Sequence, residues 1–99
     1  MFFHEEPNRI YAADENKKLI AEITFPSIRE NLVDLNHTFV DPSLQGQGIA
    51  GELVRSAAEL FRRNSLKAIV TCSYASQWFQ KHPEYADVLD AYPGRAGEN

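Results

Sequence analysis

The sequence is poor in cysteine and has no long apolar run. Its one cysteine, Cys72, cannot form a disulfide within the chain, which is typical of proteins from a reducing compartment. The longest apolar stretches, such as Ala68-Ile69-Val70, are far too short to cross a bilayer. The N-terminus lacks the basic and apolar segments of a secretory signal. We therefore expect a cytoplasmic protein that does not interact with a membrane.

Positive charge is also scarce. The chain has 10 Lys and Arg against 14 Asp and Glu, a formal net charge of −4. Because affinity for phosphate backbones comes mainly from Lys and Arg, we do not expect a nucleic acid as partner. The histidines are dispersed and there is no pair of cysteines, so no metal is expected either.

The length and composition are those of one globular domain. A chain of 99 residues is long enough for one domain and too short for two. Hydrophobic residues make up 43% and charged residues 24%, which are ordinary values for a folded protein. We expect a single domain over residues 1–92 and a disordered tail at 93–99.

Alternating apolar and polar residues predict three strands in the first half of the chain. The segments 9–13, 18–25 and 32–40 are joined by short polar stretches at 14–17 and 27–31, which predicts an antiparallel meander. The alternation in the last segment places four side chains on one face: Val33, Leu35, His37 and Phe39.

The second half of the chain predicts a helix, a buried strand and two short helices. Apolar residues form one stripe along residues 48–63, and the apolar run 66–71 follows as a strand parallel to the preceding one. Two short helices are expected at 75–81 and 83–89. The predicted fold class is α+β: a mixed, twisted sheet made of an antiparallel meander and one parallel β-α-β crossover, with one main helix and two short C-terminal helices.

The loop before the main helix has the spacing G-x-G-x-x-G at residues 46–51. A dinucleotide-binding fold does not fit, because at least two antiparallel strands precede the loop and the next strand ends in Thr71-Cys72-Ser73 without an acidic residue. Glycines still let the backbone approach a ligand, and the free N–H groups of a helix start attract anions. The loop is therefore either a pyrophosphate site or a tight turn that binds nothing.

Residues 40–50 resemble the acetyl-CoA signature of the GNAT superfamily of N-acetyltransferases, V-x-P followed by Q/R-x-x-G-x-G/A. Three residues occupy the signature positions: Gln45, Gly48 and Ala50. Residues 75–81 are similar to the A-x-x-L/F-Y-x-K helix of the family. Two further stretches resemble those of its short, YjdJ-like subgroup: Cys72-Ser73-Tyr74 and His82-Pro83-Glu84-Tyr85.

The resemblance implies a GNAT-like fold with acetyl-CoA as cofactor. Backbone N–H groups of the loop would hold the pyrophosphate, and the pantetheine arm would lie in a gap where the strands at 32–40 and 66–71 splay apart, bonded to the backbone near Phe39 and Val40. The residues expected to contact the cofactor are Phe39, Val40, Gln45, Gly46, Gln47, Gly48, Ile49, Ala50 and Phe79.

Acetyl transfer to an amine requires a base and a means of stabilising the leaving thiolate. The resemblance places Phe79 where the family often has a Tyr that acts as the acid and protonates the leaving thiolate. Because Phe79 has no hydroxyl, Tyr74 or Tyr85 could serve as this acid instead. It also places Cys72 near the thioester, where it either accepts the acetyl group or lines the pocket as a small hydrophobe.

Three strand residues are candidate bases. His37 is the first of them and would accept a proton from Cys72 or from an incoming amine. A histidine that packs at the edge of the core is an equally ordinary interpretation. Asp34 and Glu22 are the other two, and surface charge is the simpler explanation for both.

The sequence thus favours an acetyl-CoA-dependent N-acyltransferase that acts on an unidentified amine, small molecule or protein, through Cys72 and His37. Two alternatives stay open: an acetyl-CoA-binding module without transferase activity, and a protein-interaction domain that retains the fold. The short chain has little material for an acceptor pocket. We expect a monomer or a weak homodimer.

Overall fold

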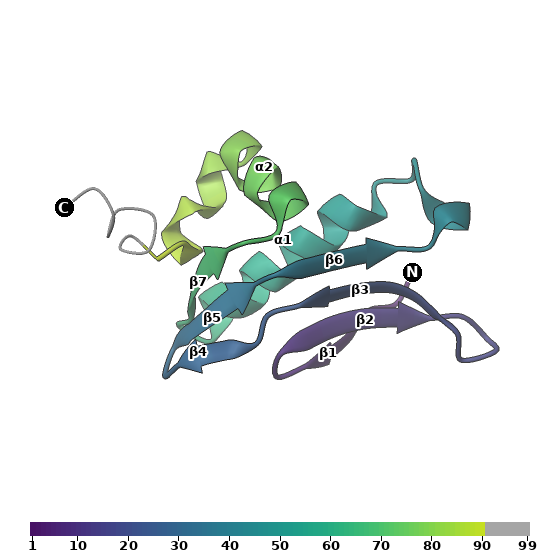
Figure 1. Cartoon of the computed structure of the whole chain (residues 1–99), viewed down its shortest axis with the longest axis horizontal. Helices are drawn as coiled ribbons and strands as arrows, with labels where there is room; N and C mark the ends of the chain where they lie inside the picture. The colour runs from purple at the N-terminus through teal and green to yellow at the C-terminus, as the bar shows by residue number, and fades with distance from the viewer. Residues whose placement is uncertain (91–99) are drawn as a thin grey trace.

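Two sheets and one long helix build the molecule in the computed structural model, which describes residues 1–90 (Figure 1). The first sheet is antiparallel, in the order β1-β2-β3-β6: His4–Glu6, Arg9–Ala13, Leu19–Thr24 and His37–Val40. The second has the order β4-β5-β7: Ser27–Arg29, Leu32–Leu35 and Lys67–Val70. Strands β5 and β7 are parallel, so the predicted α+β fold with one crossover is confirmed. The predicted tail at 93–99 lies outside the described residues.

The β2–β3 hairpin follows the predicted alternation. Ile10 pairs with Ile23 and Ala12 with Ala21, and all four side chains are buried. Asp14 closes the connecting turn, because its Oδ1 accepts hydrogen bonds from the N–H groups two and four residues later, at 2.8 and 2.9 Å.

The predicted strand at 32–40 is interrupted at Asn36, which separates β5 from β6. The N–H of Asn36 donates to the carbonyl of Thr24 at 3.2 Å, and the next residue, His37, pairs with the same Thr24. Two residues opposite one form a β-bulge, which reverses the inward and outward positions beyond it. Val33 and Leu35 belong to the core before the bulge, whereas Thr38 and Val40 face the helix side after it. The predicted uninterrupted alternation is therefore wrong beyond residue 35.

Two short strands were not predicted. Residues 27–29, expected to be part of a turn, form β4, which pairs with β5, and the turn is confined to the following residues, where Asn31 has a φ of 63°. β1 pairs with β2 at the N-terminal edge. All residues of β1 and β4 are exposed, so neither strand has the alternation between buried and exposed side chains that identifies a strand in a sequence.

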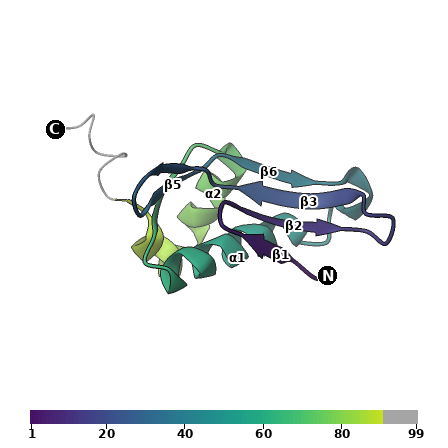
Figure 2. The same ribbon diagram turned by 90° about the horizontal axis from the view of Figure 1, so that it is seen from below.

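Helix α1, Ile49–Arg63, lies across one face of the sheets and carries the predicted apolar stripe (Figure 2). Phe61 is fully buried and meets Phe25 of the meander edge to face, with ring centroids 5.0 Å apart. The residues that the helix buries are Ile49, Leu53, Val54, Ala57, Ala58, Leu60 and Phe61. No described element covers the opposite face of the four-stranded sheet.

Two short helical segments follow β7 and pack back onto α1 (Figure 1). They are α2, Ser73–Lys81, and η2, Pro83–Val88, which is a 3-10 helix. Tyr85 fastens η2 to α1 because its hydroxyl donates to Glu59 at 2.6 Å. No helix within residues 1–90 is both long and apolar enough to cross a membrane.

Candidate functional site: a pocket at the start of α1

The chain leaves β6 through a rigid turn, η1, Pro42–Leu44. Asp41 caps it: its Oδ2 accepts hydrogen bonds from the N–H of Ser43 at 3.0 Å and from the Ser43 hydroxyl. These hydrogen bonds, with a smaller contribution from Lys18, hold the pKa of Asp41 below its ordinary value. The turn therefore fixes the position from which the glycine loop starts.

The glycine loop exposes a row of backbone N–H groups. Gly46 and Gly48 have φ values of 87° and 78°, a left-handed conformation that other residues adopt only with strain. The first backbone hydrogen bond of α1 runs from Glu52 N to Gly48 O at 3.1 Å. Within residues 1–90 the N–H groups of residues 46 and 48–51 have no hydrogen-bond acceptor, whereas the Gln47 N–H closes the turn at residues 45 and 46. This row, at the positive end of a helix, has the character of an anion-binding site.

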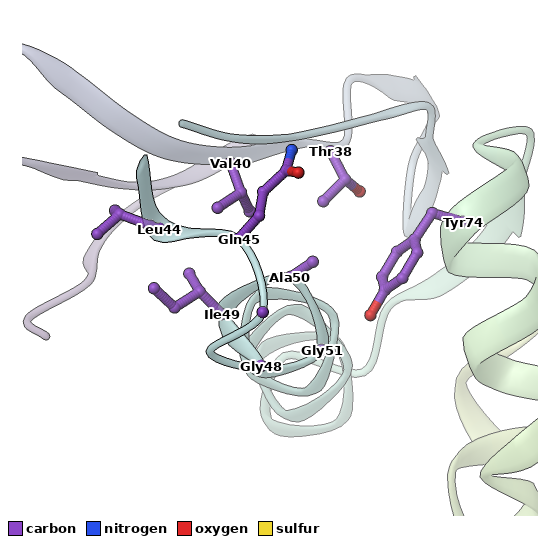
Figure 3. Close-up of a pocket in the computed structure, with 10 residues that line it drawn as sticks. Thr38, Val40, Leu44, Gln45, Gly48, Ile49, Ala50, Gly51 and Tyr74 are labelled. Carbon is purple, nitrogen blue, oxygen red and sulfur yellow. The ribbon is translucent and has the colours of Figure 1, made fainter. Parts of the chain in front are cut away.

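A pocket of about 390 Å³ opens above these N–H groups (Figure 3). Its residues come from three elements: β6 on one side, the loop and first turn of α1 below, and the start of α2 opposite. They are Thr38, Val40, Leu44, Gln45, Gly46, Gly48, Ile49, Ala50, Gly51 and Tyr74. The volume lies in the range of small-molecule sites.

Helix α2 approaches α1 closely at Gly51. A Cβ atom on this residue would lie 3.4 Å from Trp78 Nε1 and 3.5 Å from the Tyr74 hydroxyl, which are ordinary contact distances. Tyr74 and Trp78 are one helical turn apart on α2. A methyl group would therefore fit at position 51, and Tyr74 forms the far wall of the pocket.

The pocket lies where two strands diverge. Leu35 O accepts hydrogen bonds from the N–H groups of both Thr71 and Cys72, each at 3.1 Å, which is the last connection between β5 and the chain that follows β7. Beyond it, β6 pairs with β3 and is the edge strand of the other sheet. The predicted gap between the strands is therefore present.

The register of β6 shows which backbone groups face this gap. Asp41 N donates to Ile20 O of the neighbouring strand at 2.8 Å. Since hydrogen-bonding positions alternate along an antiparallel strand, Phe39 also directs its backbone groups toward β3, whereas Thr38 and Val40 direct theirs toward the gap. Of the two residues predicted to bond a cofactor through their backbone, Val40 thus faces the gap and Phe39 does not, and Thr38 faces the gap as well.

Cys72 lies at the inner end of the gap. It is partly buried, does not line the pocket and immediately precedes α2; its Sγ forms a hydrogen bond of 3.4 Å with the pocket residue Thr38 through Oγ1. His37 is not brought to it, because the bulge directs the His37 side chain to the opposite, uncovered face of the sheet. There the side chain is 54% exposed, and its Nε2 is 4.0 Å from Glu22 Oε1. Asp34 lies on β5 of the other sheet, and its Oδ1 accepts a hydrogen bond from Thr71 Oγ1 at 2.7 Å.

The residues predicted to contact a cofactor separate into two groups. Those that line the pocket are Val40, Gln45, Gly46, Gly48, Ile49 and Ala50; those that do not are Phe39, Gln47 and Phe79. Phe79 is buried against Trp78, with ring centroids 5.2 Å apart. Sequence reasoning missed Thr38, Leu44 and Gly51, and no motif marks the bulge that turns Thr38 inward.

The structure also distinguishes the two tyrosines considered as proton donors. Tyr74 lines the pocket, whereas Tyr85 is buried between α1 and η2.

Residues 9–88 match the family model described as GCN5-related N-acetyl-transferase. Protein NATD1 of Gallus gallus and of Homo sapiens are each 32% identical over 63 residues, 64% of this chain. The matches cover 57% and 56% of those relatives, so the chain spans little more than half their length.

Two solved structures place the fold in the same group. A GCN5-like protein from Staphylococcus aureus, studied by NMR in solution, is 32% identical with a TM-score of 0.74, over 90% of this chain and 87% of that one. The GNAT-family N-acetyltransferase YhbS of Escherichia coli, crystallised with CoA, is 19% identical with a TM-score of 0.55, over 63% of this chain and 38% of that one. The second match shows a shared fold.

Proposed function

The chain belongs to the GCN5-related N-acetyltransferase family, and from that premise we propose that it binds acetyl-CoA in the pocket and transfers the acetyl group to an amine. The observation that carries the proposal is the row of free N–H groups of residues 46 and 48–51, open to a pocket beside a free strand edge. A pyrophosphate supplies the acceptors that these donors lack. The chain itself is acidic, so local backbone dipoles, rather than net charge, provide the attraction.

The pantetheine arm is proposed to lie along the free edge of β6. Its amide groups can pair with the backbone of Thr38 and Val40 as an additional strand would. From the loop, the arm then runs between β6 and Tyr74 and brings the thioester to Thr38 and Cys72.

Transfer is proposed to proceed through Cys72. Its thiolate attacks the thioester carbonyl, the bond between carbonyl carbon and CoA sulfur breaks, and the CoA thiolate leaves and takes up a proton. A neutral amine then attacks the acetyl-cysteine, which returns the Cys72 thiolate, and the amine loses a proton to a base. The base is proposed to be water, because the His37 side chain lies on the face of the sheet opposite the pocket, away from Cys72.

Calorimetry with acetyl-CoA, CoA and NAD tests the binding step. We expect heat from both CoA species and none from NAD, because the loop and the free edge together fit a pantetheine-bearing pyrophosphate. Heat from neither CoA species contradicts the proposal and leaves an interaction domain.

Mass spectrometry after incubation with acetyl-CoA tests the Cys72 route, which predicts an acetyl adduct that disappears in Cys72→Ser. Binding without an adduct and without turnover over an amine panel indicates a binding module, an outcome to which the buried Phe79, without a hydroxyl, lends support.

A matched pair of variants separates binding from folding. Gly48→Val forces a β-branched residue into the left-handed region beside the pocket, whereas Asn31→Val, at a φ of 63°, imposes similar strain in the distant β4–β5 turn. Both should lose stability, of the order of 1–3 kcal/mol. Only Gly48→Val should also lose CoA affinity in calorimetry. Equal affinities in the two folded variants would contradict the assignment of the loop.

A further inference from the structure

Thr38, which lines the pocket, is in contact behind the pocket with Cys72, which does not line it. The strands on either side are still joined at Leu35 O, which accepts two backbone hydrogen bonds. Where they begin to part, Thr38 Oγ1 of β6 and Cys72 Sγ, after β7, lie 3.4 Å apart and bridge the gap. Thr38 is the β6 residue of the pocket that lies farthest along the strand from the glycine loop.

This contact leaves no space for additional carbon atoms between the two side chains. Carbon atoms approach their neighbours to about 3.5–4.0 Å, so a methylene group placed between Thr38 and Cys72 requires about twice the observed separation. The pair cannot open freely, because Thr38 is fixed in the β3–β6 ladder and Cys72 packs against the hydrophobic core. Thr38 and Cys72 are therefore held beside each other, and we call this pair the wall behind the pocket.

We propose that the Thr38–Cys72 contact limits the acyl group of the donor to about the size of acetyl. The inference rests on the proposed function, since it takes the thioester to lie where the arm along β6 ends. An acetyl group then reaches the wall, and each further methylene of a propionyl or butyryl group has to displace it. The two side chains thus determine donor specificity, separately from any role in the transfer itself.

The test is a ratio of dissociation constants, measured by calorimetry with acetyl-CoA, propionyl-CoA and butyryl-CoA on the same protein. A misfit of one methylene changes affinity by about 10- to 200-fold, so the parent protein should bind butyryl-CoA at least about tenfold more weakly than acetyl-CoA. Thr38→Ala removes two heavy atoms from the wall and should bring this ratio close to one. Cys72→Ala opens the wall from the other side and should act in the same direction.

Near-isosteric substitutions are the matched controls. Thr38→Val and Cys72→Ser keep most of the volume of the wall, so both should retain the preference for acetyl-CoA. Using a ratio within each variant cancels any change in affinity for the CoA portion, and circular dichroism verifies that each variant is folded. If one alanine variant fails to fold, the other decides.

The outcomes also separate this inference from the proposed function. Parent protein that binds CoA but binds butyryl-CoA as tightly as acetyl-CoA refutes the wall alone. The same conclusion follows if Thr38→Val shifts the ratio as much as Thr38→Ala, because volume is then not the cause. Absence of CoA binding overturns both.

Discussion

Replacing Val40 with proline tests the assignment of a free backbone edge on β6. The register directs the Val40 N–H toward the gap and the Phe39 N–H toward Glu22 on β3. Proline lacks an N–H group and is tolerated on the open side of an edge strand. Val40→Pro should therefore remove a donor for the pantetheine arm, while Phe39→Pro should break the β3–β6 ladder.

The register also sets the expected magnitudes. Loss of one neutral hydrogen bond costs about 0.5–1.5 kcal/mol, and about 1–3 kcal/mol if its partner stays buried and unsatisfied. For Val40→Pro we expect acetyl-CoA binding to weaken by about 1–2 kcal/mol, roughly 5- to 30-fold, with a smaller loss of folding free energy. For Phe39→Pro we expect the larger loss in folding free energy and the smaller loss in acetyl-CoA affinity, because the Glu22 carbonyl loses its hydrogen-bond partner inside the sheet.

Urea unfolding and calorimetry on the same preparations provide the two measurements. The urea midpoint reports the free energy of unfolding, and the dissociation constant reports the edge contact. Val40→Pro protein that binds acetyl-CoA as tightly as the parent would refute the idea that the arm pairs with this edge. A larger loss of stability in Val40→Pro than in Phe39→Pro would show that the inferred register of β6 is wrong.

Three further predictions concern the core, acid stability and the pocket wall. Phe61→Ala should lower the free energy of unfolding by about 3–5 kcal/mol in urea titrations, because Phe61 is fully buried against Phe25; an effect below 1 kcal/mol would contradict the packing. The hydrogen bond from Arg62 holds the pKa of Asp87 below its ordinary value of 3.8, so its stabilising effect is complete above that pH and is lost as the pH falls through the folded pKa; Asp87→Asn should weaken this acid dependence in melting curves. Tyr74→Ala should weaken CoA binding more than Tyr74→Phe if the Tyr74 ring forms the far side of the pocket, opposite β6. Equal losses would show that the hydroxyl group is responsible instead.

The elements with a regular pattern were predictable from the sequence. The stripe of Leu53, Ala57 and Phe61 fixes the buried face of α1, and alternation fixes the β2–β3 hairpin. The glycine loop was predictable because its spacing, its position before a helix and its resemblance to a known signature agree.

The parts that depend on long-range pairing were not predictable. Residues 32–40 are compatible with one continuous strand, because nothing local reveals that Asn36 and His37 both face Thr24. Because of this one extra residue, the His37 side chain faces away from Cys72 and the Thr38 side chain faces toward it, the opposite of what uninterrupted alternation predicts. Tyr74 and Tyr85 are likewise distinguished only by how α2 and η2 pack on α1.

The bulge at Asn36 gives one unbroken stretch of backbone two separate tasks. Residues before it are committed to the parallel pairing with β7 that holds the molecule together, and residues after it are released from that neighbour. Deleting this single amino acid would return the polypeptide to simple two-residue periodicity with Thr38 still inward and His37 still outward, and would remove the bend at which the strand leaves β7. The cavity is thus encoded by the length of a strand as much as by the identity of the side chains around it.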